Sequence, residues 1–170
     1  MRLYSYVVRV DEKFAPNPTN DYCTLGCCKP KIRNKAEIGD WIIGTGSVQN
    51  YGNNKLVYAM KVNEKLTFDS YHKDERFKGR IDNIYFKNNE GAYTQIAKPK
   101  YHGSKGQMHH DMGSKYVLIS KEFVYYGEEA ITIPTDVKWI IKKGPGHKST
   151  CFTQKQINQF VEWILPKLMK

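Results

Sequence analysis

Short runs of apolar residues, separated by clusters of Gly, Pro and Asn, dominate the first part of the chain. Leu3 to Val10 is rich in β-branched and aromatic residues and predicts a buried strand. Trp41-Ile42-Ile43 predicts a second strand, which we expect to stop at the turn Gly44–Ser47. Residues 56–62 predict the clearest strand, because apolar side chains occupy both of its alternating faces.

The second part of the chain shows similar runs after a polar interval. Residues 116–120, 123–126, 131–133 and 137–141 predict further strands. Two short helices are predicted earlier, over residues 25–34 with Pro30 in the first turn, and over residues 70–77 at the surface. Residues 79–114 are rich in Gly, Asn, Lys and His and predict a long irregular segment, the kind of segment in which ligand sites often form.

The last segment has a helical period. Ile157, Phe160, Val161 and Ile164 fall at positions i, i+3, i+4 and i+7, so one helical face is apolar. Thr153 is a suitable N-cap. We therefore predict a C-terminal amphipathic helix that Pro166 ends.

These elements predict an α+β fold. About six strands without alternating helices exclude a doubly wound parallel sheet and favour a small, partly closed mixed β-barrel. A few helices would flank this barrel, with the amphipathic helix at the C-terminus. A chain of 170 residues without internal repeats predicts one domain over residues 1–170.

The charge adds a class of partner. Lys and Arg outnumber Asp and Glu by 27 to 17, and a formal charge of +10 attracts polyanions such as the nucleotides and nucleic acids of a bacterial or phage cell. Twelve Tyr residues offer flat faces on which bases can stack. The same composition also suits a basic protein without a specific ligand.

Neither a signal peptide nor an apolar segment of membrane-spanning length is evident, which predicts a cytoplasmic protein without membrane contact. The four cysteines, Cys23, Cys27, Cys28 and Cys151, are then expected to be reduced thiols. The sequence leaves the oligomeric state open.

The common catalytic motifs are absent: the chain has no P-loop, no dinucleotide-binding glycine motif, no nucleophile elbow of the G-x-S-x-G type and no H-E-x-x-H. No cofactor is expected, and no metal site either, because no tetrahedral ligand spacing is evident. Four groups of residues still carry candidate chemistry.

The first group is the segment Tyr22 to Lys31. Lysines beside a cysteine favour its thiolate, so Cys27 is a candidate nucleophile, with Tyr22 and Cys23 beside it. Lys29 and Lys31 are candidate phosphate contacts. The alternative is that these cysteines are small apolar residues of the core.

Two glycine-containing turns form the second and third groups. Gly44, Thr45, Gly46 and Ser47 combine close backbone approach with hydroxyl groups, and therefore suit a phosphate or a base edge. His147, in the basic loop 142–148, is a candidate anion contact. Ordinary surface turns have the same composition.

The fourth group lies in the irregular segment. His and Asp side chains there suit acid–base chemistry, with His102, His109 and Asp111 as catalytic candidates. Asp82, Asn83 and Tyr85 are candidate substrate contacts. Otherwise these residues are solvated loop positions.

Several blocks of sequence resemble one known family, named nucleotide modification associated domain, type two. They occur in order along almost the whole chain and comprise residues 3–9, 14–18, 22–32, 39–47, 56–60, 82–85, 117–127 and 144–147. The resemblance implies a link to enzymes that modify nucleotides in DNA, without implying a defined reaction. The turn at Ile38-Gly39-Asp40 and the two strands beside it also resemble PUA-like and EVE-type barrels, which bind bases.

Three hypotheses follow. The first is a nucleotide-modifying protein, with phosphate contacts from Lys29, Lys31 and the 44–47 turn. Bases would stack on Tyr22, Trp41 or Tyr85. The second is a non-catalytic PUA-like reader that holds a modified or flipped base in an aromatic pocket. The third is a small metal-dependent nuclease or toxin.

Overall fold

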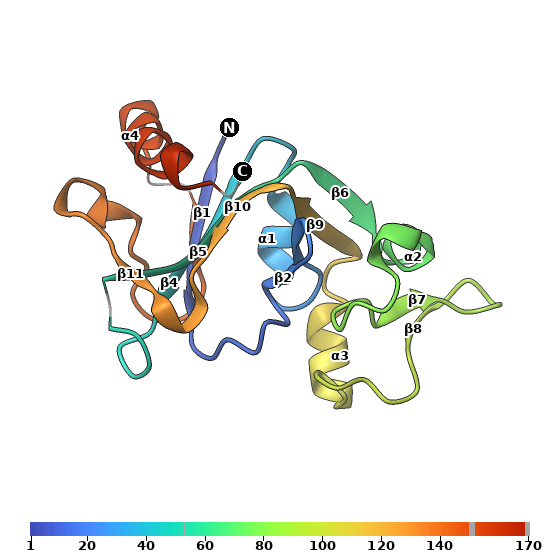
Figure 1. The fold of residues 1–170 in the computed structure, drawn as a ribbon. Helices are drawn as coiled ribbons and strands as arrows, with labels where there is room; N and C mark the ends of the chain where they lie inside the picture. Colours follow the sequence, from blue (N-terminus) through green and yellow to red (C-terminus); the bar gives the residue numbers. More distant parts are fainter. Residues whose placement is uncertain (53, 150–151, 169–170) are drawn as a thin grey trace. The chain divides into compact units, whose positions relative to one another are not determined.

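The computed structural model describes residues 1–52, 54–149 and 152–168. They form two compact units, each assembled from separate stretches of sequence (Figure 1). The first unit comprises Met1–Asp11, Ala36–Asn63 and the chain from Ser120 onward. The second unit comprises Glu12–Lys35 and Glu64–Ile119. The two units are described separately below.

A mixed six-stranded sheet forms the first unit. Its main path runs β10-β5-β4-β1-β12, and β11 also pairs with β5. β1 and β4 are parallel, with Leu3 beside Trp41, and the other pairings are antiparallel. The strands are β1 (Leu3–Val8), β4 (Trp41–Gly46), β5 (Lys55–Lys61), β10 (Glu122–Tyr125), β11 (Ile131–Thr132) and β12 (His147–Lys148).

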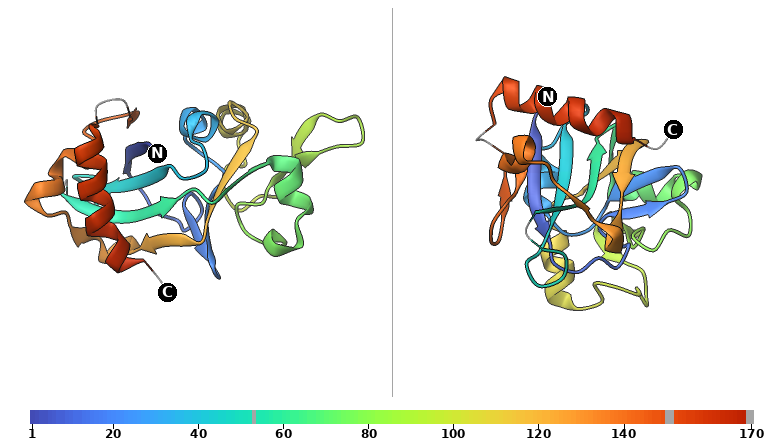
Figure 2. Two further views of the ribbon diagram at one scale, coloured as in Figure 1. Left: turned by 90° about the horizontal axis from the view of Figure 1, so that it is seen from above. Right: turned by 60° about the vertical axis from the view of Figure 1, so that its left-hand side comes forward.

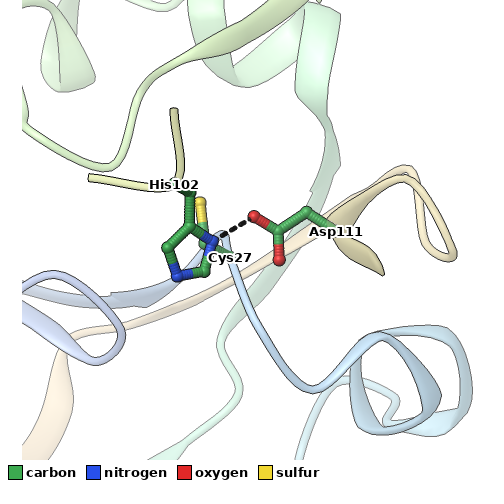
Figure 3. Close-up of side chains that lie close together, drawn as sticks. All are labelled: Cys27, His102 and Asp111. Carbon is green, nitrogen blue, oxygen red and sulfur yellow. Dashed lines mark hydrogen bonds and ion pairs between the residues drawn. The ribbon is translucent and has the colours of Figure 1, made fainter. Parts of the chain in front are cut away.

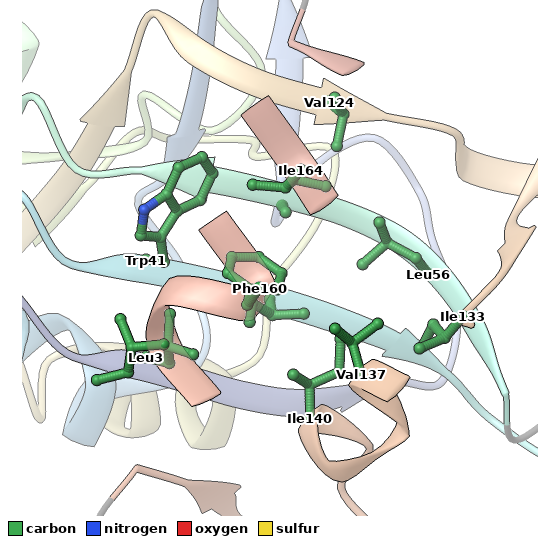
Figure 4. Close-up of a cluster of buried hydrophobic side chains, with 12 residues drawn as sticks. Leu3, Trp41, Leu56, Val124, Ile133, Val137, Ile140, Phe160 and Ile164 are labelled. Atoms are coloured by element: carbon green, nitrogen blue, oxygen red, sulfur yellow. The ribbon is translucent and has the colours of Figure 1, made fainter. Parts of the chain in front are cut away.

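The C-terminal helix α4 (Gln154–Ile164) covers this sheet (Figure 2). As predicted, Thr153 caps it, and Gln156 completes the reciprocal capping interaction. Phe160 packs edge-on against Trp41, with ring centroids 5.5 Å apart, inside the main cluster of buried side chains (Figure 4). A short 3₁₀ helix, η4 (Leu165–Lys167), follows and contains Pro166.

Two predictions in the first unit are wrong. Residues 137–141 are not a strand, because Thr135–Ile140 forms the 3₁₀ helix η3. Val137 and Ile140, three residues apart, both reach the buried cluster from this helix. A further 3₁₀ helix, η2, spans Gly127–Glu129.

The predicted turn at Gly44–Ser47 is the other error, because β4 continues to Gly46 and is buried throughout. A Cβ atom on Gly44 would lie 2.4 Å from the Tyr58 ring and 2.7 Å from Val8. The protein's own side chains therefore fill the space beside Gly44, and packing explains the glycine.

The second unit contains a four-stranded sheet in the order β2-β3-β9-β6, and a separate hairpin of β7 and β8. Its strands are β2 (Asn17–Thr19), β3 (Tyr22–Leu25), β6 (Glu64–Thr67), β7 (Tyr85–Lys87), β8 (Tyr93–Gln95) and β9 (Tyr116–Ser120). Its helices are α1 (Pro30–Lys35), α2 (Phe68–Lys73), the 3₁₀ helix η1 (Glu75–Phe77) and α3 (Lys105–Asp111).

Residues 79–114 are therefore less irregular than predicted. They hold the β7–β8 hairpin and α3, whose start is fixed by a capping box between Ser104 and Gln107. α1 begins at Pro30 and not at residue 25 as predicted, because Leu25 belongs to β3 and the fixed φ of Pro30 suits a helix start. β9 and β10 are separated by a single residue and lie in different sheets.

The mixed α+β class with few helices and a C-terminal helix is confirmed, whereas neither sheet closes into a barrel over the residues described. No helix among those residues is long and apolar enough to cross a membrane.

Gly44→Ala should destabilise the first unit by about 1–3 kcal/mol, because the added methyl group overpacks the site at Tyr58 and Val8. The measurement is denaturant unfolding. Gly106→Ala is the matched control, since a Cβ there has nothing within 4 Å and the residue is helical. Equal stability of the two variants would contradict the packing role of Gly44.

Candidate active site

The turn that follows β3 has an unusual backbone. Cys28 and Lys29 are consecutive non-glycine residues with φ of 58° and 42°, in the left-handed region. Such conformations cost roughly 1–2 kcal/mol per residue and persist only where the surroundings enforce them. His102 has a φ of 57° as well. Lys13 and Asn20 of this unit also have positive φ, so these are three of five such non-glycine residues among those described.

The side chains of these strained residues meet. The Sγ atom of Cys28 lies 3.5 Å from Nε2 of His102. On the other edge of the ring, Nδ1 of His102 donates to Oδ2 of Asp111 at 2.5 Å (Figure 3). A thiol, an imidazole and a carboxylate thus stand in one row, the order in which nucleophile, base and orienting acid occur in thiol enzymes.

Asp111 is completely buried and its carboxylate has two further donors. The backbone amide of Cys28 donates to Oδ1 at 2.7 Å, and the Tyr85 hydroxyl donates to Oδ2 at 2.8 Å. Gln95 donates from Nε2 to the carbonyl oxygen of His102 at 2.9 Å. The carboxylate therefore fixes the ring on one side and the Cys28 turn on the other.

A buried guanidinium also links the Cys28 turn to the segment that contains Asp111. Arg33 donates to the carbonyl oxygens of Cys28, Asp111 and Tyr116, each at 2.7 Å, and to that of Ser114 at 3.0 Å. These bonds tie α1 and the Cys28 turn to the end of α3. Arg33 also adds a positive charge close to Asp111.

The opposite charges of His102 and Asp111 stabilise each other. The hydrogen bond with Asp111, and then the contact with Cys28, raises the pKa of His102 to about 10. Burial acts to raise the pKa of Asp111, but the hydrogen bond and charge of His102, with the Tyr85 and Cys28 amide bonds, hold it below its ordinary value. The pair is therefore an imidazolium and a carboxylate at neutral pH.

Cys27, the nucleophile that the sequence suggested, has a different environment. Its side chain is completely buried, and burial raises the pKa of its thiol well above the usual value. Its sulfur lies 3.9 Å from the carbonyl oxygen of Asp82. The catalytic role of Cys27 stays a prediction, but the geometry favours its neighbour Cys28.

Cys28 was missed because two adjacent cysteines look equivalent in sequence. One signal was present: Cys23, Leu25 and Cys27 repeat with a period of two, which is typical of residues on one face of an extended segment. Cys28 falls outside that set, just before the helix start at Pro30. Its contact with His102, 74 positions later, has no sequence signal.

The structure brings some of the predicted residues together. Cys27, Tyr85, His102 and Asp111 are mutual neighbours, and one donor atom from each of Cys27, His102 and Asp111 lies within 4.8 Å of the others, so these three could hold a metal ion. Lys29, half-buried, follows Cys28 directly, while Lys31 and His109 are exposed.

Asp82 and Asn83 belong to a second polar cluster. Asp82 is buried and accepts from Asn17, Thr24 and Tyr71, with the Arg80 guanidinium 3.5 Å away. Asn83 donates to the carbonyl oxygens of Tyr71 and Phe77. This cluster ties the β2–β3 hairpin to residues 71–83. The substrate roles of Asp82 and Asn83 stay predictions.

Two further predicted contacts lie in the second unit. Tyr22 is half-buried and packs edge-on against Phe77, and Cys23 is buried. Trp41, Gly44, Thr45, Gly46, Ser47 and His147 lie in the first unit. Trp41 is part of the core there, and Thr45 donates to the carbonyl oxygen of Tyr6. Their substrate roles stay predictions too.

A family model described as nucleotide modification associated domain 2 matches residues 1–170. The chain belongs to this family. The family resemblance seen in the sequence is thereby confirmed over the full length. No curated protein and no solved structure matches the chain.

For this nucleotide modification associated domain 2 protein, we predict a pH-dependent contribution of His102 to stability. Because its pKa is raised in the folded state, the contribution is fully present below the ordinary value of about 6.5. It is lost as the pH rises through about 10. The measurement is the difference in unfolding free energy between the unmodified protein and His102→Gln, in chelator-containing buffer, from neutral pH upward.

The comparison of the two proteins cancels the titration of lysines and tyrosines, which they share. The difference should shrink towards high pH. A difference that stays constant across the range would show that His102 is not held as an imidazolium.

Proposed function

We propose that this protein is a thiol-dependent enzyme that modifies a nucleotide or nucleic acid, with Cys28 as its nucleophile. The proposal is carried by two contacts of one imidazole ring: Nε2 of His102 contacts Sγ of Cys28, and Nδ1 of His102 contacts Oδ2 of Asp111. The family name supplies the substrate class, since it associates the domain with nucleotide modification.

The geometry supports acyl chemistry. Cys28 reacts as the thiolate partner of the His102 imidazolium, which carries the proton of the thiol, and the thiolate attacks an electrophilic acyl carbon of the substrate. The new C–S bond forms as the leaving group departs with the proton that His102 returns. Water or an amine then attacks the thioester, restores the Cys28 thiol and releases the product. Asp111 keeps the ring in place throughout.

The charge around this row suits a phosphate-bearing substrate. Residues 22–36 and 91–110, which carry Cys28 and His102, contain seven Lys and Arg and no Asp or Glu. This local charge of +7 is most of the net +10 of the chain. Arg33 is buried, but Lys31, Lys98 and Lys105 are exposed. Lys29 and Lys31 are the phosphate contacts that we propose, and Tyr22 is the proposed residue for base stacking.

The two other hypotheses have less support. A reader needs accessible aromatic faces, and two of the three residues expected to stack, Trp41 and Tyr85, are almost fully buried. A metal-dependent nuclease typically uses oxygen ligands, whereas the donors that converge here include thiols and an imidazole. We propose that both units form one domain, because the family model spans them, and that the protein acts in the cytoplasm, where thiols stay reduced.

Alkylation by iodoacetamide tests the nucleophile. At neutral pH with a chelator present, Cys28 should react faster than the buried Cys23 and Cys27, and His102→Gln should slow its reaction about tenfold or more. Fragment-ion mass spectrometry reads each cysteine separately. His110→Gln, at an exposed position on α3, is the matched control and should leave the rate unchanged.

Equal reaction of the three cysteines, or a rate at Cys28 that is indifferent to His102→Gln, would refute the proposed nucleophile. Cys151 lies outside the described residues and is replaced by Ser in every variant, so that it adds no background.

Binding of a single-stranded oligonucleotide tests the phosphate contacts. Lys29→Ala with Lys31→Ala should weaken binding and reduce the slope of log K against log salt by about 0.7 for each phosphate that the two lysines neutralise. Lys138→Ala, exposed in the first unit, is the control. If the double variant and the control behave alike, Lys29 and Lys31 do not contact phosphate.

A further inference from the structure

The donor atoms around His102 also meet the requirements of a soft metal ion. Zinc holds sulfur at about 2.3 Å and imidazole nitrogen at about 2.0–2.1 Å, so that two such donors at a tetrahedral angle lie about 3.5 Å apart. The Cys28 Sγ and His102 Nε2 atoms are 3.5 Å apart. The separation of these two atoms is therefore that of two ligands of one zinc ion.

A third donor is close by. The Cys27 sulfur lies within 4.8 Å of a ring nitrogen of His102 and of a carboxylate oxygen of Asp111, and all three side chains come together in Figure 3. Cys27 and Cys28 are adjacent in the chain, and both are next to the same imidazole. Two sulfurs and one nitrogen form a set that selects Zn²⁺ over Mg²⁺ or Ca²⁺.

The surroundings of the ring are those of a metal-ligating histidine. Such a histidine usually donates its other ring N–H to a carboxylate, which fixes the tautomer and the ring orientation. His102 donates Nδ1–H to Asp111, and Asp111 is itself held by the Cys28 amide and the Tyr85 hydroxyl. Nε2 is thereby directed at the sulfur of Cys28.

We propose that Zn²⁺ binds reversibly to Cys27 Sγ, Cys28 Sγ and His102 Nε2, with Asp111 as the carboxylate partner of the imidazole, and that it inhibits the enzyme by occupying its nucleophile. As the metal–ligand bonds form, the thiols and the imidazolium release their protons to the buffer, and no atom changes its oxidation state. Water completes the coordination. The inhibition rests on the proposed function, whereas zinc binding itself does not.

Zinc alone is the probe, titrated against the full chain in competition with a chromogenic chelator. We expect one ion per chain, with affinity reduced about tenfold or more in Cys28→Ser and in His102→Gln, and also reduced in Cys27→Ser. His110→Gln, on the exposed face of α3, should bind zinc as the unmodified protein does. Cobalt(II) should give the sulfur-to-metal charge-transfer absorption of a thiolate site.

A second readout needs no variant: zinc should protect Cys28 from iodoacetamide in the unmodified protein, and magnesium should not. Absence of zinc binding, or equal affinity in Cys28→Ser, His102→Gln and the unmodified protein, would overturn the proposal. Unchanged affinity in Cys27→Ser would remove Cys27 from the ligand set.

The two proposals fail separately. The alkylation experiment is run with chelator and tests the nucleophile without metal. The titration is run without electrophile and tests the metal site without chemistry. His102-dependent alkylation with no zinc binding would leave the enzyme proposal and refute the metal site, and the opposite pair of results would do the reverse.

Discussion

The buried carboxylate of Asp111 is the constraint on which the candidate site depends. A charge removed from water is tolerated only where hydrogen bonds and an opposite charge compensate it. Asp111 obtains these from the Cys28 amide, the Tyr85 hydroxyl and the His102 ring, which belong to three separate segments of the second unit. Satisfying one carboxylate therefore fixes the turn after β3, the β7 strand and the loop that precedes α3 relative to one another.

Arg33 is the counterpart of Asp111. Its guanidinium is buried and gives its hydrogen bonds to four carbonyl oxygens, including those of Cys28 and Asp111. Together the two charged groups restrain both ends of the Cys28 turn. This explains how left-handed conformations at Cys28, Lys29 and His102 persist, because each is held by bonds that a relaxed backbone would break. The strain keeps a reactive thiol beside an imidazole instead of inside the core.

The contrast between the two neighbouring cysteines shows how the fold separates chemistry from packing. Cys27 is completely buried, in a cluster with Phe14, Phe68 and Val117. Cys28, one residue later, contacts His102 instead. The row formed by Cys28, His102 and Asp111 is the basis of both the covalent mechanism and the metal site that we propose. The chain belongs to a nucleotide modification family, and Cys28 and His102 lie in strongly basic stretches of its sequence.

The sequence by itself determined the elements whose signals are local. The sequence showed the period of α4, its cap at Thr153, the strand near residues 55–61 and the basic charge, because each depends on composition or on residues a few positions apart. His102 and Asp111 were found as candidates by residue type alone. Only the tertiary structure decided that they face Cys28, that Gly44 is a packing position, and that residues 137–140 are helical. These outcomes depend on contacts between distant segments, and such contacts are set by the burial of Asp111 and by core packing, which leave no periodic pattern in the chain.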